Sequence, residues 1–417
     1  MIGESSVHIK KLVYGGYGLG EIGGRKLLVD YSVPGEVVKV EVLKDKGDYA
    51  LATVKDVVFP SEERREAPCP YYGRCGGCQL QHIRYDAQLR AKAEILLETL
   101  RRIGRLEIRD LDSVVYGEEF GYRVRAQFKV QGSKLGFFER RSHRLVEIEK
   151  CLLLHPSINR LIPSLRELSN RAPNISEIHV SYSPTEDEFL IKLISKDFLA
   201  KEKLRKIMEN TLPKEVKGLG FYRKSQREYY LGRDFTFYSI GPYRYRVSMD
   251  SFFQINYLLW EDFINTAMPS NHYNTALELH CGVGFFSLFL AKKSGFVHSY
   301  DSSPSAIRDA EYNARINSVD NLFFYNEKSL YALKRHAGEV IDLIFLDPPR
   351  SGLSEGEAKL ITANRPKEMV YVSCEPTTFA RDLKVLTRGG YNLRHVSLID
   401  NFPNTYHIES VARLSLD

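Results

Sequence analysis

Apolar and polar positions divide the chain into three parts with different periodicities. The first part alternates β-branched runs, at residues 37–42 and 52–58, with turns rich in glycine. This pattern is typical of small β-barrels, so we predict a five-stranded, OB-like barrel over residues 1–58. A charged segment bounded by prolines, residues 60–68, then links the barrel to the rest of the chain.

The middle part mixes helical and strand periodicities. From residue 85 to 103 the apolar side chains recur at the spacing of one helical face. Alternation of period two then predicts four strands, at residues 123–130, 145–148, 178–182 and 189–194. We therefore expect an α+β central domain over residues 59–240. Its helix at 85–103 is a candidate to pack on the domain that follows.

The last part repeats strands, turns and helices. Residues 276–284 form an apolar strand that ends in an acidic residue and a Gly-x-Gly turn, and a helix is expected at 285–292. Further strands are expected at 297–301 and 341–347. This succession predicts an α/β domain with a doubly wound sheet over residues 241–417.

Charge and hydropathy limit the kinds of partner that the protein is expected to bind. The net charge is +6, and residues 59–240 carry 33 Lys and Arg against 25 Asp and Glu. A basic middle part favours contact with a nucleic acid, although a modest excess also fits a solvated face. No apolar run approaches the roughly 20 residues of a membrane-spanning helix, and the start of the chain lacks the pattern of a signal peptide. We expect a cytoplasmic protein without membrane contact.

Six cysteines are spread unevenly along the chain. Three of them, Cys69, Cys75 and Cys78, lie within ten residues, and Cys151 follows much later. Because four thiolates can bind either a structural zinc ion or an iron–sulfur cluster, the spacing leaves both possibilities open. Both fit this layout better than disulfides do.

The Gly-x-Gly turn indicates a nucleotide-like cofactor. Gly282 and Gly284 would let the backbone approach an adenosine group, and Asp301, about 20 residues later, could accept hydrogen bonds from ribose hydroxyls. Dehydrogenases share this arrangement. The third strand ends in Asp347-Pro-Pro-Arg350, which favours a methyltransferase over a hydride-transfer enzyme.

Cys374 and Glu409 suit methylation at a pyrimidine carbon. Carbon 5 of uracil is a poor nucleophile until a thiolate adds to carbon 6, and a base must later remove the carbon-5 proton. Cys374 can supply the thiolate and Glu409 the base. The alternative is that Cys374 is an unreactive cysteine buried in the hydrophobic core.

On the basis of these residues, the chain resembles the RNA uridine-5-methyltransferases. In particular, it resembles the branch with an amino-terminal TRAM barrel and a [4Fe–4S] cluster. The matching segments are residues 251–256, 278–284, 373–376 and 402–409, and the likeness covers nearly the whole chain. The resemblance implies a Rossmann-like catalytic domain that uses S-adenosylmethionine. It also implies four cluster ligands, with zinc as the alternative metal: Cys69, Cys75, Cys78 and Cys151.

The same resemblance implies the roles of individual residues. Cys374 would be the nucleophile and Glu409 the base. The expected contacts with S-adenosylmethionine are Gln254, Glu278, Gly282, Gly284, Asp301 and Asp347. The chain departs from the usual pattern at His280, Phe285 and Glu375, the last of which stands where the family often has Asn.

We therefore expect a monomeric enzyme that methylates carbon 5 of a uridine in structured RNA. Few glutamines among many lysines and glutamates resemble a thermophile composition, which favours uridine 54 of tRNA over a uridine of 23S rRNA. The target base should be flipped out of its stack, with Phe252 or Phe253 as a stacking partner unless these rings are core. One rival hypothesis is that the protein is a non-catalytic RNA-binding factor. Another is that it methylates carbon 5 of cytosine or an amine of adenine.

Overall fold

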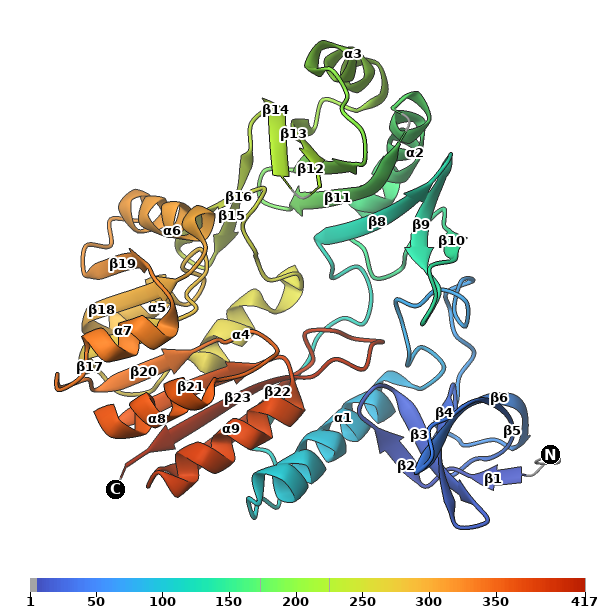
Figure 1. Cartoon of the computed structure of the whole chain (residues 1–417), viewed down its shortest axis with the longest axis horizontal. Coiled ribbons are helices and arrows are strands. Elements are labelled where there is room, and N and C mark those ends of the chain that lie inside the picture. The colour runs from blue at the N-terminus through green and yellow to red at the C-terminus, as the bar shows by residue number, and fades with distance from the viewer. Residues whose placement is uncertain (1–5, 173, 225, 417) are drawn as a thin grey trace.

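The computed structural model describes residues 6–172, 174–224 and 226–416. Three parts surround the centre of the molecule in Figure 1: a small barrel, a central sheet with two helices, and a large α/β part that carries the C-terminal strands. The barrel, the α+β middle and the doubly wound sheet of the expected fold class are all present. Residues 1–5 of the predicted barrel and residue 417 lie outside the described residues.

The barrel has six strands where the sequence predicted five. The extra strand arises because the chain bends after His8. There Ile9 N–H bonds Glu36 O, and Lys10 N–H bonds Leu19 O, both at 2.8 Å, so the chain exchanges one partner strand for another. The strands are β1 (Ser6–His8), β2 (Lys11–Val13), β3 (Tyr17–Ile22), β4 (Arg25–Asp30), β5 (Val37–Asp45) and β6 (Tyr49–Phe59), in the order β1-β5-β6-β4-β3-β2.

The central sheet contains all four strands expected from the alternating pattern, and three more. Its order is β10-β9-β8-β11-β12-β13-β14. The strands are β8 (Arg125–Gln131), β9 (Lys134–Phe138), β10 (Leu145–Glu147), β11 (Ile175–Ser183), β12 (Glu188–Ser195), β13 (Val216–Arg223) and β14 (Gln226–Gly232). Helices α2 (Pro156–Arg171) and α3 (Lys201–Thr211) contact each other beside this sheet. A hairpin of β15 (Phe235–Ile240) and β16 (Tyr243–Ser248) leads to the third part.

The third part is built on an eight-stranded sheet in the order β19-β18-β17-β20-β21-β23-β22-β7. Its strands are β17 (Tyr273–Leu279), β18 (Ser294–Asp301), β19 (Leu322–Asn326), β20 (Leu343–Leu346), β21 (Glu368–Ser373), β22 (Asn392–Ile399), β23 (Glu409–Ser415) and the distant β7 (Ser113–Val115). The first five strands in this order, β19, β18, β17, β20 and β21, run parallel to one another. Strand β23 lies between β21 and β22 and runs antiparallel to both.

Helices cover this sheet, which explains its sequence pattern. All four residues of β20 are buried, as is usual for parallel strands with helices on both faces. The helices are α4 (Trp260–Ala267), α5 (Ser287–Leu290), α6 (Pro304–Ile316), α7 (Ser329–Arg335), α8 (Glu355–Asn364) and α9 (Pro376–Arg388). The helix expected at 285–292 is shorter, because the glycine turn extends to Phe286 and the chain continues as a 3₁₀ turn after Leu290.

The helix expected at 85–103 is present as α1 (Tyr85–Thr99) and a π-helical turn (Leu100–Gly104). It contacts α9, and β7 soon after it pairs with β22 at the edge of the large sheet. Residues 85–115 therefore lie against the third part in Figure 1, although they precede the central sheet in sequence. Among the described residues, no helix is long and apolar enough to cross a membrane.

Candidate active site

Cys374 and Glu409 lie at the ends of neighbouring strands. Strand β21 ends at Ser373, strand β23 begins at Glu409, and Ser373 is opposite Ser410 in this antiparallel pair. Cys374 directly follows Ser373, and Glu409 directly precedes Ser410, so both residues lie at the same end of this strand pair. They are close enough for Glu409 to raise the pKa of the Cys374 thiol. The structure thus brings together the two side chains that the sequence predicted as nucleophile and base.

Burial and nearby acids raise the pKa of both groups. Burial, Glu409 and Asp347 raise the pKa of the Cys374 thiol to about 12, whereas Arg350 opposes this shift. Burial and Asp347 likewise raise the pKa of Glu409 well above its usual range, while Arg350 and a hydrogen bond from Asn401 lower it. Burial thus favours the neutral form of each group, whereas Arg350 favours the charged form.

The segment before Glu409 is fixed by residues from the first quarter of the chain. Asn404 adopts a left-handed backbone conformation with φ 64° and is fully buried. Its carbonyl accepts hydrogen bonds from Gln79 N–H (3.1 Å) and Leu80 N–H (3.0 Å). Its own N–H donates to Gln88 Oε1 (3.0 Å), and its side-chain oxygen accepts from Gln88 Nε2 (3.1 Å). Residues 69–80, called the cysteine loop from here on, and helix α1 together hold this segment.

A buried ion pair adds to the same attachment. Lys92 Nζ on α1 donates to Asp400 Oδ1 (2.5 Å) and to the carbonyl of Phe402 (3.1 Å). The side chains of Lys92 and Asp400 are 1% and 0% exposed. Charges removed from water are stable only when paired and hydrogen-bonded, so α1 is firmly tied to the chain that leads to Glu409.

The predicted cofactor turn lies where the strands β17, β18 and β20 end. Gly282 and Gly284 have φ of 56° and 85°, values that favour glycine. The N–H of Gly282 donates to Asp301 Oδ2 (3.0 Å) at the end of β18. Asp301 Oδ1 also accepts from Ser303 N–H (2.8 Å). This carboxylate therefore shapes the turn between the strand ends.

Two further carboxyl groups face the same region. Glu278 is 1% exposed, and one of its oxygens accepts from Ser287 (2.5 Å) and Ser299 (2.6 Å), while the other has no hydrogen-bond partner. Burial is the main cause that raises the pKa of Glu278 and of Asp347 to about 7, and in each case Asp301 contributes. A cationic ligand would favour the charged forms of these acids.

Gln254 lies on the other side of the site, in a loop before α4. Its side-chain oxygen accepts from Asn401 Nδ2 (3.4 Å), the residue that also bonds Glu409. The two neighbouring phenylalanines differ sharply: Phe253 is 1% exposed and stacks on Tyr238, whereas Phe252 is 67% exposed. Phe253 therefore belongs to the hydrophobic core, whereas the ring of Phe252 is exposed and available to a ligand.

Sequence reasoning missed Arg350 and Asn401 as members of this site. Arg350 follows the Asp-Pro-Pro turn and approaches both Cys374 and His407, whose Nδ1 is 3.4 Å from Arg350 Nη2. Asn401 joins Gln254 to Glu409. The signals were present, because Arg350 and Asn401 directly adjoin the Asp-Pro-Pro and Phe-Pro-Asn-Thr segments.

The four early cysteines are all free and partly exposed. Their thiols affect one another: besides burial, Cys151 and Cys75 raise the pKa of Cys78, and Cys69 raises that of Cys75. Asn159 holds the Cys151 backbone through two hydrogen bonds, of 2.8 and 3.0 Å. Nevertheless, no three His, Cys, Asp or Glu side chains within the described ranges are arranged to hold a metal ion.

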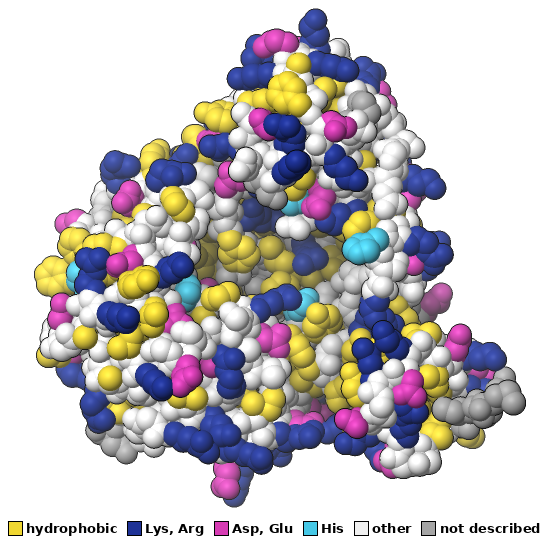
Figure 2. Space-filling model, in the orientation of Figure 1, with side chains coloured by type: hydrophobic (Ala, Val, Ile, Leu, Met, Phe, Trp, Pro, Cys, Tyr) yellow, Lys and Arg dark blue, Asp and Glu magenta, His cyan; other side chains and the backbone are white. Residues whose placement is uncertain are grey.

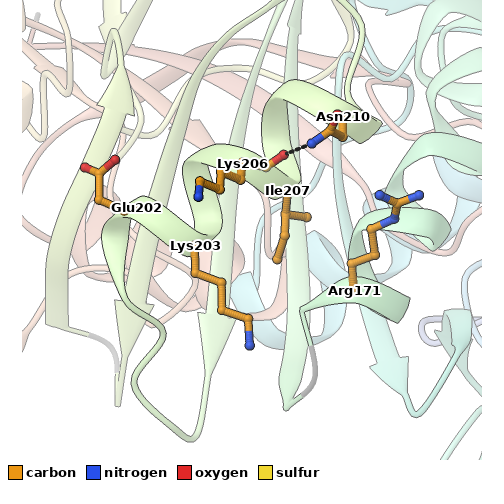
Figure 3. A pocket seen from close by; sticks show the side chains of 6 residues that line it. All are labelled: Arg171, Glu202, Lys203, Lys206, Ile207 and Asn210. Atoms are coloured by element: carbon orange, nitrogen blue, oxygen red, sulfur yellow. Dashed lines mark hydrogen bonds between the residues drawn. The ribbon is translucent and has the colours of Figure 1, made fainter.

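The surface around the site is hollowed. Figure 2 shows a depression between the three parts, with hydrophobic side chains in its floor and Lys and Arg around it. A second, shallow cavity of about 340 Å³ lies on α2 and α3 and contains none of the predicted site residues (Figure 3). Its lining has three cations and one carboxylate: Arg171, Glu202, Lys203, Lys206, Ile207 and Asn210.

Comparison with known proteins gives a consistent result. The sequence model described as tRNA (uracil-5-)-methyltransferase matches residues 84–416. An uncharacterized RNA methyltransferase from Aquifex aeolicus is 48% identical over 414 residues, covering 98% of this chain and 97% of that protein. One from Thermotoga maritima is 31% identical, with 98% of each chain covered.

A solved structure shares the fold over almost its entire length. The tRNA (uracil-54, C5)-methyltransferase of Pyrococcus abyssi, in complex with S-adenosyl-L-homocysteine, superposes with a TM-score of 0.80 at 24% identity. The match covers 98% of this chain and 99% of that one. All three parts of the fold are therefore shared with that enzyme.

Proposed function

Because the chain belongs to the tRNA (uracil-5-)-methyltransferase family, we propose that it methylates carbon 5 of a specific uridine through a covalent bond between Cys374 and carbon 6. S-adenosylmethionine would supply the electrophilic methyl group. The observation that carries the proposal is the pairing of β21 with β23, which brings Cys374 and Glu409 to the same end of the sheet, close enough for Glu409 to affect the Cys374 thiol. One residue can then act at carbon 6 while the other acts at carbon 5 of the same ring.

The residues divide the proton transfers between them. Cys374 must release its proton to solvent water to add to carbon 6 as a thiolate, which the cation of Arg350 favours. The electron pair of the ring double bond then moves to carbon 5, which would take the methyl group from the sulfonium donor and leave S-adenosyl-L-homocysteine. Glu409, whose carboxylate form is favoured by Arg350 and by the hydrogen bond from Asn401, then takes the carbon-5 proton, and the thiolate leaves carbon 6 as the ring double bond re-forms. Cys374 is free for another cycle.

The cofactor site fits a bound S-adenosylmethionine. We propose contacts through Gln254, Glu278, the turn of Gly282 and Gly284, Asp301 and Asp347, as the sequence suggested. The unpartnered oxygen of Glu278 and the raised pKa values of Glu278 and Asp347 support this assignment, because a sulfonium cation nearby would stabilise their charged forms.

The proposed substrate is tRNA, with uridine 54 as the target. The description of the matched family model names tRNA, and the Pyrococcus abyssi enzyme with the same fold is a uracil-54 methyltransferase. A base in a stacked helix cannot present both ring faces, so the uridine must be flipped out. The exposed ring of Phe252 is suited to stack on a base beside the site.

We also propose that Cys69, Cys75, Cys78 and Cys151 bind a [4Fe–4S] cluster. The support is that all four are free, partly exposed and close enough to affect one another's pKa.

Transfer of a labelled methyl group from S-adenosylmethionine tests the function. Three RNAs are compared: a tRNA transcript, the same transcript with cytidine at position 54, and a 23S rRNA fragment. Label in the first alone establishes the proposed target, and label only in the rRNA fragment replaces it with rRNA. The label should disappear in Cys374→Ala, and methylation by that variant would refute the covalent mechanism. Glu409→Gln should instead accumulate the RNA adduct on a denaturing gel.

A further inference from the structure

The turn between β2 and β3 carries Tyr14 from the barrel to the rim of the active site. Its glycines, Gly15 and Gly16, have φ of 97° and 75°. A Cβ at Gly16 would lie 2.9 Å from the Cβ of Gln79, so the turn is pressed against the cysteine loop. The carbonyl of Gly15 also accepts from Arg140 Nη2 (2.7 Å). Contacts from two other parts of the molecule thus fix where Tyr14 lies.

Tyr14 touches the two segments that carry the reacting side chains. Its hydroxyl donates to Glu375 Oε2 (2.8 Å), the residue after Cys374. Its ring packs edge-on against Tyr406, with 5.4 Å between centroids and 83° between planes. Tyr406 in turn packs on His407, two residues before Glu409. A single side chain of the barrel therefore joins the nucleophile loop to the segment of the base.

The bond to Tyr14 replaces an ordinary role of Glu375. Glu375 is the residue that precedes α9, yet its side chain makes no capping hydrogen bond to the helix. Acidic groups near helix starts are stabilised by the free N–H groups there. Here the carboxylate turns to the barrel instead, while the Glu375 N–H donates to Ser373 Oγ (3.3 Å). The loop that carries Cys374 is therefore bonded to the barrel through Tyr14.

We propose that Tyr14 is a positioning residue for methyl transfer: by holding Glu375 and Tyr406 at once, it fixes Cys374 relative to Glu409. The inference rests on the proposed chemistry at Cys374 and goes beyond it, because it makes the barrel a part of the catalytic unit. Tyr14 acts through its two neighbours rather than on the uracil. Its effect should appear in the rate of covalent bond formation and not in ligand affinity.

The test measures adduct formation in a single turnover with a tRNA that carries 5-fluorouridine at the target. Fluorine at carbon 5 cannot be removed as a proton, so the adduct persists. Tyr14→Phe should slow adduct formation about tenfold, the loss expected for one hydrogen bond to a charged group, with unchanged Kd for S-adenosylmethionine and RNA. Tyr49→Phe, elsewhere on the same barrel, should retain the wild-type rate.

Substitutions at Glu375 test the same contact from its other end. Glu375→Ala should match the loss in Tyr14→Phe, whereas Glu375→Gln, whose amide oxygen can still accept from Tyr14, should retain most of the rate. The double variant Tyr14→Phe/Glu375→Ala should be no slower than either single variant. A wild-type rate in Tyr14→Phe, equal rates in the two Glu375 variants, or multiplied losses in the double variant would overturn the proposal.

A failure of the proposed function can be told apart from a failure of this inference. If the wild-type protein forms no adduct, the covalent chemistry is wrong, and amide hydrogen exchange over residues 400–409 of the unliganded protein tests the contact by itself. Faster exchange in Tyr14→Phe supports the positioning role. Unchanged exchange there overturns it.

Discussion

Removal of Lys92 should destabilise the molecule far more than removal of a neighbouring surface charge. The change Lys92→Met keeps the hydrocarbon stem and deletes the ammonium group, which leaves Asp400 buried without its partner ion. Breaking a buried pair from one side costs about 3–5 kcal/mol. Arg90→Met, two residues earlier on α1, removes exposed ion pairs with Glu63 and Asp86, and should cost about 1 kcal/mol at most.

A double variant separates the ion pair from simple packing. Lys92→Met/Asp400→Leu removes both charges, so no unpaired ion remains in the interior. We expect it to be more stable than either Lys92→Met or Asp400→Leu, with a coupling energy of about 3 kcal/mol. If the double variant loses the sum of the two single losses, Lys92 and Asp400 do not form the pair described here.

The measurement must resolve one region of a large molecule. A chain of several parts can unfold in several steps, so a single melting temperature would mix them. Native-state hydrogen exchange in α1 and in β22 and β23 reports the local opening free energy directly. A loss below about 1 kcal/mol in Lys92→Met, similar to the loss in Arg90→Met, would refute the reasoning from burial.

Four further experiments test the site and its surface. Because the pKa of Asp347 is about 7 in the unliganded protein, calorimetry should show affinity for the sulfonium cofactor rising as pH increases from 6 to 8, by at most about tenfold per unit. Asp347→Asn should flatten this rise. The same raised pKa predicts that the unliganded fold loses stability as pH rises from 4 to 7, which urea titrations at each pH can follow. Phe252→Ala should weaken single-turnover methylation of RNA about tenfold without changing cofactor affinity, since stacking on a base is worth about 1–3 kcal/mol, and an unchanged rate would exclude stacking. Finally, Lys203→Gln/Lys206→Gln should lower tRNA affinity and the salt dependence of binding in filter-binding assays, and an unchanged salt slope would show that the cavity of Figure 3 does not contact phosphates.

Local motifs suggested individual residues of the candidate site, whereas their arrangement in space depends on the fold. The glycine turn and the Cys374 segment are short motifs, and their chemistry can be read from neighbouring residues. The pairing of Cys374 with Glu409 depends on β23, which lies antiparallel between two earlier strands. Local periodicity does not predict such a pairing, because the alternation of side chains along a strand does not determine which other strand lies beside it.

Polar residues with structural roles were equally hard to recognise. Lys92 lies on a helix whose periodicity suggests an ordinary polar face, and only the fold shows that it is buried. Asn404 is a residue type common in turns, yet its backbone and side chain form hydrogen bonds with four earlier segments, at Arg65, Gln79-Leu80, Gln88 and Glu119. Likewise, the bend that splits the first barrel strand in two follows from hydrogen bonds to distant residues, so the strand count could not be obtained from alternation alone.

The place of β23 in the large sheet has a consequence for the order of events during synthesis. Strands β21 and β22 leave the ribosome before β23, yet in the finished sheet they are separated by it. Until residues 409–415 have been made, the edge of β21 that pairs with β23 is open, and the carboxyl group of Glu409 is missing from the end of the sheet where Cys374 lies. A nascent chain that stops short of this strand therefore carries the Cys374 thiol without Glu409. If the proposed mechanism holds, such a chain cannot complete methyl transfer.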